Sequence, residues 1–169
     1  MALAVTLGGC ISAFPDEVLR GVDPSLTVAA LRAGPPGAHL NARVMLGGEV
    51  LSTLPKVGET EMEVLARRLG SSGSPERSDL SEGRFLVRTK GFLDPAVFAT
   101  GRRVTVVGTV VADEERPIGD LSYRYPVIES QDIRLWPPDV TLAPYPYPYW
   151  PYWGVYGVWR PYRLWRPYW

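Results

Sequence analysis

The stretch VTVVGTVV, residues 104–111, decides the fold class of this chain. Seven of its eight residues are β-branched, five valines and two threonines around one glycine. Such side chains favour the extended backbone, and a run without polar alternation is typical of a strand covered on both faces. Gly108 interrupts the run, which predicts a bend or bulge at a place where no side chain is tolerated.

Other segments on both sides of this run also have strand patterns. Apolar residues alternate over positions 40–46, just before Gly47 and Gly48. Phe85 and Val87 alternate with basic residues over 84–90, and 123–136 is typical of one or two further strands with Pro126 at an edge or kink. The charged run DEERP at 113–117 is predicted to be a turn.

Two segments between these strands are less regular. In 59–69, Met62, Leu65, Ala66 and Leu69 match helical spacing, whereas alternation with glutamates matches a strand, and the period slightly favours the helix. Residues 70–83 contain five serines and a proline and are predicted to be an exposed loop. Five short strands with glycines at the bends predict an all-β fold, a small five-stranded barrel of the oligonucleotide/oligosaccharide-binding (OB) type.

Composition excludes several classes of protein. The 169 residues suffice for one domain, and 18 basic residues balance 18 acidic ones, which argues against a nucleic-acid partner. No apolar run reaches the roughly 18 residues of a spanning helix. Because Cys10 and His39 are each the sole residue of their type, an internal disulfide is impossible, and a Cys/His zinc site or catalytic triad is not expected. We therefore expect no metal, no cofactor and no enzymatic activity.

The first ten residues resemble the end of a secretory signal. Residues 1–9 are uncharged, apolar and small, and residues 7–10 (LGGC) resemble the lipobox of bacterial lipoproteins, in which the cysteine is lipidated. A positively charged segment is missing before the apolar run, so either the start lies further upstream or the segment is no signal. In the second case Cys10 is a buried thiol.

The last 26 residues, 144–169, hold 12 of the 19 aromatic residues of the chain, six prolines, three arginines and no acid. Alternating Tyr-Pro favours an extended chain and cannot form a core, so this tail is predicted to be disordered or extended. It is either a loose low-complexity extension, an anchor at the membrane interface, or an aromatic platform for glycan. The residues we expect to contact a surface or ligand are Trp150, Trp153, Trp159, Arg160, Trp165, Arg166 and Trp169.

Motifs across the middle of the chain resemble the Slp family of outer-membrane lipoproteins, starvation-inducible lipoproteins without an agreed biochemical activity. They are GRFL at 83–86, GFLDP at 91–95 with Phe98, GR at 101–102, VTVVG at 104–108, IG at 118–119, Tyr123, YPV at 125–127 and LWP at 135–137. The family usually has Arg-Trp where this chain has Met45 and Leu46. The resemblance implies that Cys10 is lipidated and that 59–66 is a strand.

The resemblance also implies a division of the chain. We expect a partial signal peptide at 1–9, a lipid-anchored linker at 10–37, the barrel at 38–137 and the low-complexity tail at 138–169. Ile11 follows Cys10 where an Asp would retain a lipoprotein at the inner membrane. The predicted protein is thus anchored in the outer membrane, faces the periplasm and serves as an envelope accessory protein. The alternative is a glycan- or peptidoglycan-binding module that uses a barrel groove or the tail.

Individual residues of the barrel have structural interpretations. We expect residues 92–95 to form a turn in which Asp94 accepts backbone N–H groups, and Gly101 and Gly119 to adopt positive φ. Three aromatics (Tyr123, Tyr125 and Trp136) are expected to pack on the barrel with their polar atoms at its edge, or else to line a ligand groove. His39 is predicted to be solvated.

Overall fold

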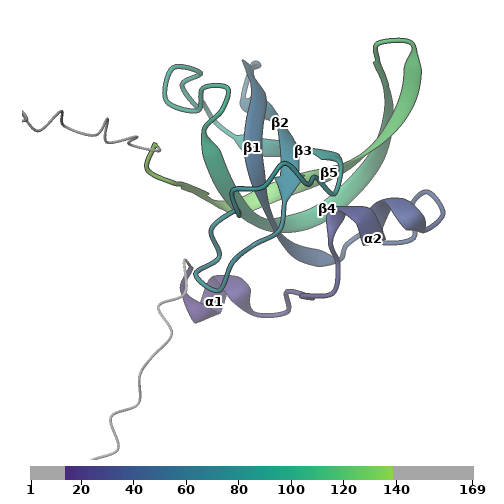
Figure 1. Cartoon of the computed structure of the whole chain (residues 1–169), viewed down its shortest axis with the longest axis horizontal. Coiled ribbons are helices and arrows are strands. Elements are labelled where there is room, and N and C mark those ends of the chain that lie inside the picture. The colour runs from purple at the N-terminus through teal and green to yellow at the C-terminus, as the bar shows by residue number, and fades with distance from the viewer. Residues whose placement is uncertain (1–13, 139–169) are drawn as a thin grey trace, which may run out of the picture. The chain divides into compact units, whose positions relative to one another are not determined.

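The structure is a computed structural model that describes residues 14–138, and it is all-β as predicted (Figure 1). Two short helices precede five strands. The helices are α1 (Asp16–Leu19) and α2 (Val28–Ala33), and the strands are β1 (Arg43–Pro55), β2 (Glu59–Arg67), β3 (Arg84–Lys90), β4 (Arg103–Ile118) and β5 (Leu121–Leu135). The predicted tail and the predicted signal lie outside the described residues.

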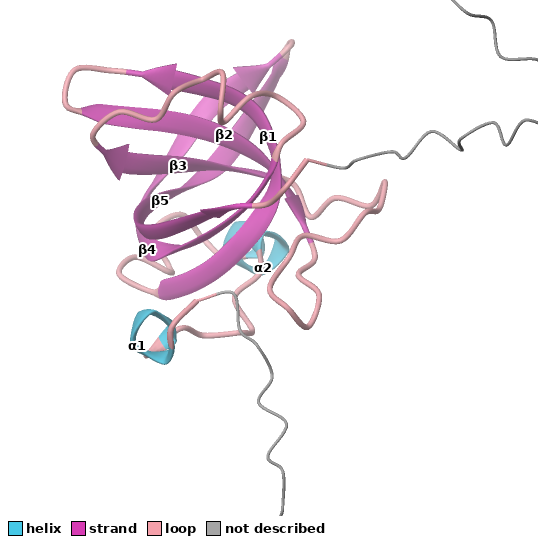
Figure 2. Ribbon diagram, turned by 90° about the vertical axis from the view of Figure 1, so that its left-hand side faces the viewer, coloured by secondary structure: helices cyan, strands magenta, loops and turns pink. Residues whose placement is uncertain are grey.

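The five strands close into a barrel in the order β1-β2-β3-β5-β4, with β4 returning to β1, so the predicted five-stranded barrel is confirmed. Neighbouring strands run antiparallel, except that β3 pairs with β5 in parallel over three residue pairs. Figure 2 shows the strands wrapped around a common interior. Alternate side chains of each strand point into it, because successive Cβ atoms of a strand face opposite sides.

The interior is filled with branched and aromatic side chains. Phe85 and Met62 are the largest fully buried residues, and valines from every strand except β5 surround them. Helix α2 closes one end of the barrel, where Val28 and Leu31 join the same core. The hydroxyl of Thr27 caps this helix by accepting from the N–H of Ala30 at 3.2 Å.

The helical spacing at 59–69 is misleading, and the strand implied by the family resemblance is correct. In β2, Met62, Val64 and Ala66 point into the core, while Glu61 and Glu63 point to the outer face. The helical spacing shares Met62 and Ala66 with this strand, so the apolar residues alone do not separate the two. Two hydrogen-bonded neighbours, β1 and β3, decide in favour of the strand.

Strand β1 begins and ends later than the alternation predicts. Leu40 lies in a turn and is 47% exposed, and the strand continues through Gly47 and Gly48 to Pro55. The glycines are needed inside the strand, because a Cβ on Gly48 would lie 2.0 Å from the carbonyl oxygen of Leu65 on β2. The pair therefore marks a close approach of two strands and does not end the first one.

The predicted turn at 113–117 is wrong, since these residues continue β4. They pair with residues 122–126 of β5, and the chain reverses at Gly119 and Asp120, where Gly119 has the predicted positive φ of 59°. We call residues 112–127 the β4–β5 hairpin. Its charged residues are stable in a strand because their side chains find ion-pair partners on the barrel, as described below.

The β4–β5 hairpin curls back over the outside of the barrel. Leu86 on the outer face of β3 packs with Tyr125 and Val127, and Ala112, Ile118 and Tyr123 join them. These residues form a second apolar cluster, separate from the interior. The hairpin is therefore held on the barrel wall by packing and does not project freely from its root.

The connection between β2 and β3 is mostly exposed, as predicted, but two of its residues are buried against β4. Gly73 accepts a hydrogen bond from the hydroxyl of Thr105 at 2.7 Å, and Pro75 accepts one from the Arg103 guanidinium at 3.1 Å. This loop therefore covers part of the barrel wall.

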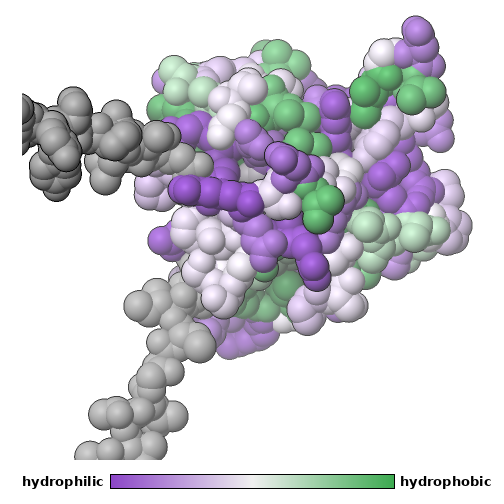
Figure 3. Space-filling model, in the orientation of Figure 1, coloured by the Kyte–Doolittle hydropathy of each residue, from purple (hydrophilic) through white to green (hydrophobic). Residues whose placement is uncertain are grey.

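Apolar side chains are exposed at the barrel end away from α1. The side chains of Leu54, Val57, Phe92 and Leu121 are each more than half exposed, and all four lie at or near strand ends. Figure 3 shows apolar surface along the upper edge of its view, over the connections between these strands. Leu40 and Leu80 are exposed as well, and Leu80 accepts a hydrogen bond from Arg67 at the end of β2, so exposed apolar residues occur at both ends of the barrel.

Candidate functional site

The N-terminal segment is attached to the barrel from Phe14 onward. Phe14 is buried, and the guanidinium of Arg43, at the start of β1, donates to the carbonyl oxygen of Val18 at 2.7 Å. Val22 forms a parallel bridge with Arg43, and the N–H of Asp23 donates to the Arg43 carbonyl oxygen. The beginning of the described chain therefore lies on the barrel and is not a free linker.

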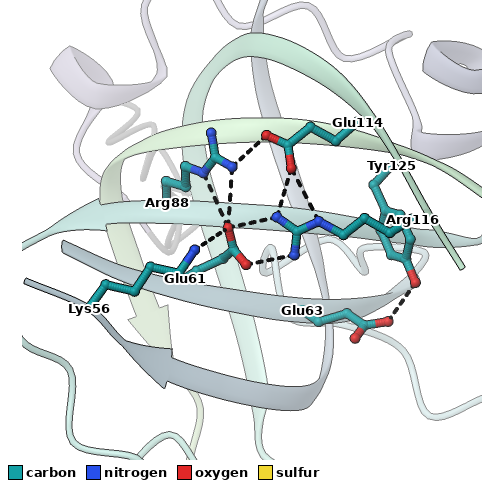
Figure 4. Close-up of polar contacts among 7 residues, drawn as sticks. All are labelled: Lys56, Glu61, Glu63, Arg88, Glu114, Arg116 and Tyr125. Carbon is teal, nitrogen blue, oxygen red and sulfur yellow. Dashed lines mark hydrogen bonds and ion pairs between the residues drawn. The ribbon is translucent and has the colours of Figure 1, made fainter.

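A charged cluster made of Lys56, Glu61, Arg88, Glu114 and Arg116 joins the β4–β5 hairpin to the outer face of β2 and β3 (Figure 4). Glu61 is its centre, with a side chain only 6% exposed. Arg116 donates to both of its carboxylate oxygens at 2.7 and 2.9 Å, an arrangement that matches the planar guanidinium to the planar carboxylate. Lys56 lies 3.0 Å away and Arg88 lies 3.3 Å away.

The cluster holds its carboxylates ionised. The hydrogen bond from Arg116 is the main reason that the pKa of Glu61 falls to about 2, although burial opposes it, and Lys56 adds to the effect. Burial alone would raise the pKa of Glu114, but hydrogen bonds from Arg116 and Arg88 lower it below its usual range. Acid–base catalysis near neutral pH needs a group with a pKa near 7, and these two carboxylates are far from that.

A second polar group lies beside the cluster. The Tyr125 hydroxyl donates to Glu63 at 3.0 Å, and Arg84 donates to the same carboxylate oxygen at 2.9 Å. Tyr123 accepts from the backbone N–H of Arg84 at 2.7 Å, and the guanidinium of Arg32 lies over its ring, 4.1 Å from the centroid. Both tyrosines thus fasten the hairpin to the barrel.

These contacts correct one prediction and confirm two others. The acids of 113–115 lie in a strand and not in the predicted turn, and Glu114 is half-buried between two arginines. The expected packing of Tyr123, Tyr125 and Trp136 is confirmed, because each has its polar atom bonded at the edge of the barrel, that of Trp136 to Thr105. The Asp94 turn is also confirmed, with the N–H of Ala96 donating to its carboxylate at 2.8 Å.

Sequence analysis missed the charged cluster. Its members come from four strands or strand ends, up to 60 positions apart, and only the register of the barrel places them side by side. One signal was present, since glutamates at every second position of 59–63 face the same side as Arg84 and Arg88 of a neighbouring strand. Such cross-strand pairing of opposite charges is visible only once the two segments are known to be neighbours.

The predicted site residues themselves lie outside the described part of the chain. These are Cys10, Trp150, Trp153, Trp159, Arg160, Trp165, Arg166 and Trp169. Between residues 14 and 138, no three His, Cys, Asp or Glu side chains are grouped so as to hold a metal ion. Neither α1 nor α2 has the length and apolar composition of a membrane-spanning helix.

Residues 7–169 match the sequence profile of the outer membrane lipoprotein Slp family. The chain belongs to this family. The match begins three residues before Cys10 and includes the barrel and the tail, so the resemblance first seen in the middle of the sequence extends over nearly the whole chain.

Individual proteins show the same relationship. The chain is 29% identical over 154 residues to the uncharacterized lipoprotein YeaY of Escherichia coli K12, an alignment that covers 89% of this chain and 78% of YeaY. It is 25% identical over 137 residues to the outer membrane protein Slp of the same organism, with 80% and 72% covered. An uncharacterized protein of Haemophilus influenzae Rd is 34% identical over 126 residues, with 72% and 67% covered. This Slp-family chain therefore shares most of its length with each of these proteins.

Proposed function

We propose that this Slp-family chain is an accessory protein of the cell envelope, held in the outer membrane by lipid on Cys10, with its barrel on the periplasmic side. Residues 7–10 have the lipobox pattern, and the family consists of outer membrane lipoproteins. Ile11 after the cysteine is compatible with export to the outer membrane. The barrel at 38–137 is then the working part, joined to the anchor through residues 10–37.

One observation carries this proposal: the chain is attached to the barrel only a few residues after the cysteine. Phe14, only four positions beyond Cys10, is buried on the barrel. Four residues span at most about 14 Å when fully extended. Lipid on Cys10 would therefore keep the helical end of the barrel close to the membrane surface.

The lipid would hold the protein permanently. Each buried CH₂ of an acyl chain contributes about 0.8 kcal/mol, so a single chain gives only reversible attachment, whereas two or more are stable. A processed bacterial lipoprotein carries three. The tail is then not needed to keep the protein on the membrane and would instead orient it.

We propose that the barrel has a structural role and no catalytic one. Glu61 and Glu114, the acids drawn together by the fold, are neutralised by arginines, and both have lowered pKa values. An aromatic groove for glycan also finds no support in residues 14–138, because the ring of Tyr123 is covered by Arg32 and that of Tyr125 is buried.

The anchor is tested by metabolic labelling. The chain, expressed behind a complete lipoprotein signal in a Gram-negative host, should incorporate labelled palmitate and fractionate with outer membranes. Cys10→Ala should remove both properties, and Ser12→Ala, two positions away, should retain them. Palmitate that persists in the Cys10→Ala protein would contradict the proposal.

The orientation is tested by protease treatment of intact and permeabilised cells. A periplasmic barrel is digested only after the outer membrane is permeabilised. Digestion in intact cells, with a periplasmic marker protein preserved, would place the barrel on the cell surface instead.

A further inference from the structure

A cavity of about 350 Å³ lies at the helical end of the barrel and takes no part in the charged cluster. Its lining comes from four places: residues 22–28 before and within α2, residues 45–47 of β1, residues 66–70 where β2 ends, and Glu82 just before β3. Its size falls near the lower limit of small-molecule sites, which measure about 300–1,000 Å³.

The inner wall of this cavity is apolar. Val28, Leu46 and Ala66 line it and belong to the buried core of the barrel, and Met45 and Leu69 add further apolar surface. Leu69 lies over Gly47, where a Cβ would be only 2.6 Å from its methyl group. An apolar chain would therefore enter a preformed space and would not need to open the core.

The rim of the cavity carries both signs of charge. Arg67 is occupied, since it pairs with Glu49 at 3.3 Å and donates to the carbonyl oxygen of Leu80. Arg68 and Glu82 also line the cavity. Within residues 14–138, neither of these two side chains has a hydrogen bond or an ion pair, with each other or with any further group. One cation and one anion are thus free at the mouth of an apolar cavity.

We propose that the cavity binds a single-chain phospholipid with a zwitterionic head group. The acyl chain fills the space between Met45, Leu46 and Ala66. Arg68 binds the phosphate, and Glu82 binds the ammonium group. Both signs of charge on the rim favour this head group over a fatty acid, whose single carboxylate would leave Glu82 unpaired and opposed by a like charge.

The position of the cavity agrees with a membrane source for this ligand. Val22 and Pro24, which line it, follow directly on the segment that attaches Phe14 to the barrel. The membrane as the source of the ligand rests on the proposed lipid on Cys10, which would hold this end of the barrel at the bilayer. Binding itself does not depend on the anchor, so the two proposals fail separately.

The test uses the full chain carrying Cys10→Ala, purified without lipid. Lysophosphatidylethanolamine below its micelle concentration should bind one to one, measured by calorimetry and by native mass spectrometry. Met45→Trp fills the cavity from a half-exposed position and should abolish binding. Leu121→Trp places the same indole on the exposed hairpin turn and should leave binding unchanged. Circular dichroism checks that both variants are folded.

The head group is tested with two further variants. Arg68→Ala should weaken binding of lysophosphatidylethanolamine by about tenfold, the usual effect of losing one charge-assisted hydrogen bond. Glu82→Gln should also weaken binding of lysophosphatidylethanolamine. It should leave the binding of lysophosphatidylglycerol unchanged, because that lipid lacks the ammonium group. Equal binding by Met45→Trp and Leu121→Trp, or no binding by the parent chain, would overturn the proposal. If neither Arg68→Ala nor Glu82→Gln changes the affinity for lysophosphatidylethanolamine, the head-group assignment is overturned.

Discussion

Glu61 is the residue on which the charged cluster depends, because three cations converge on its carboxylate. Glu61→Gln keeps the size of the side chain and removes its charge, leaving Arg88 and Arg116 partly buried beside a neutral amide. The free energy of unfolding should fall by about 1–3 kcal/mol, since the cations are one-third exposed and water screens part of the loss. Urea denaturation measures this, with Glu59→Gln on the same strand and face as the control. Equal effects of the two substitutions would contradict the central role of Glu61.

The same residue predicts how stability depends on pH. Its pKa is about 2 in the folded protein and ordinarily 4.5, so the folded state favours the ionised form. This contribution to stability is fully present above pH 4.5 and is lost as the pH falls towards 2. The urea midpoint of the parent protein should therefore decline more steeply between pH 4.5 and 2 than that of Glu61→Gln. Parallel curves would show that Glu61 titrates normally.

At the scale of elements, glycines inside strands decide how closely the strands can approach. A Cβ on Gly108 would lie 2.3 Å from the carbonyl oxygen of Glu129 on β5, at the point where the register of β4 shifts. Gly108→Ala should destabilise the protein by about 1–3 kcal/mol, because backbone must move to admit the methyl group. Gly70→Ala, with no atom nearer than 3.7 Å, should change stability by less than about 0.5 kcal/mol. Thermal melts of both variants measure the difference.

The sequence predicted those strands whose pattern of apolar residues lies within one continuous segment. The valine run became β4 with a bulge at Gly108, and the alternation of Phe85 and Val87 became β3. The end of β4 could not be predicted this way. Residues 113–117 are charged and end in proline, which is typical of a turn. They are held in a strand by pairing with residues 122–126 and by the ion pair of Arg116 with Glu61, 55 positions away. The cavity could not be predicted for the same reason, since four separate parts of the chain line it.

For the whole molecule, we expect the barrel to fold without the tail. The buried core of the described residues is contributed by α2 and the strands, all before residue 138. A chain that ends at Asp139 should melt cooperatively and give a β-type circular dichroism spectrum. An unfolded or aggregated product would show that the tail is part of the fold and that the boundary at 138 is wrong.

The tail, which lies outside the described residues, should bind a surface through its rings more than through its charges. Three arginines near an anionic surface contribute about 1 kcal/mol each and are screened within about 8 Å. Twelve aromatic rings, each burying apolar area at about 25 cal/mol per Å², contribute more even if few engage. Two variants are compared. In the tryptophan variant, alanine replaces Trp150, Trp153, Trp159, Trp165 and Trp169. In the arginine variant, glutamine replaces Arg160, Arg163 and Arg166.

Binding of the unlipidated protein to vesicles or sacculi, measured by co-sedimentation, should suffer more from the tryptophan substitutions and should survive a rise from low to physiological salt. Loss of binding in the arginine variant alone would make the tail an electrostatic patch. Absence of binding by the parent protein would leave the tail as a low-complexity extension without a surface to contact.

The ring of strands in which β4 returns to β1 has a consequence for crowding. A protein confined to one leaflet meets copies of itself in two dimensions, where the effective concentration is far higher than in solution. An unpaired strand edge would, under such conditions, act as a template on which neighbouring copies add strand to strand. Every strand of the ring has a partner on each side over part of its length, which shortens the edges left for such addition, although residues 112–118 of β4 and 121–126 of β5 pair only with each other. For a chain held by the proposed lipid on Cys10, the shorter edges make copies less prone to add strand to strand.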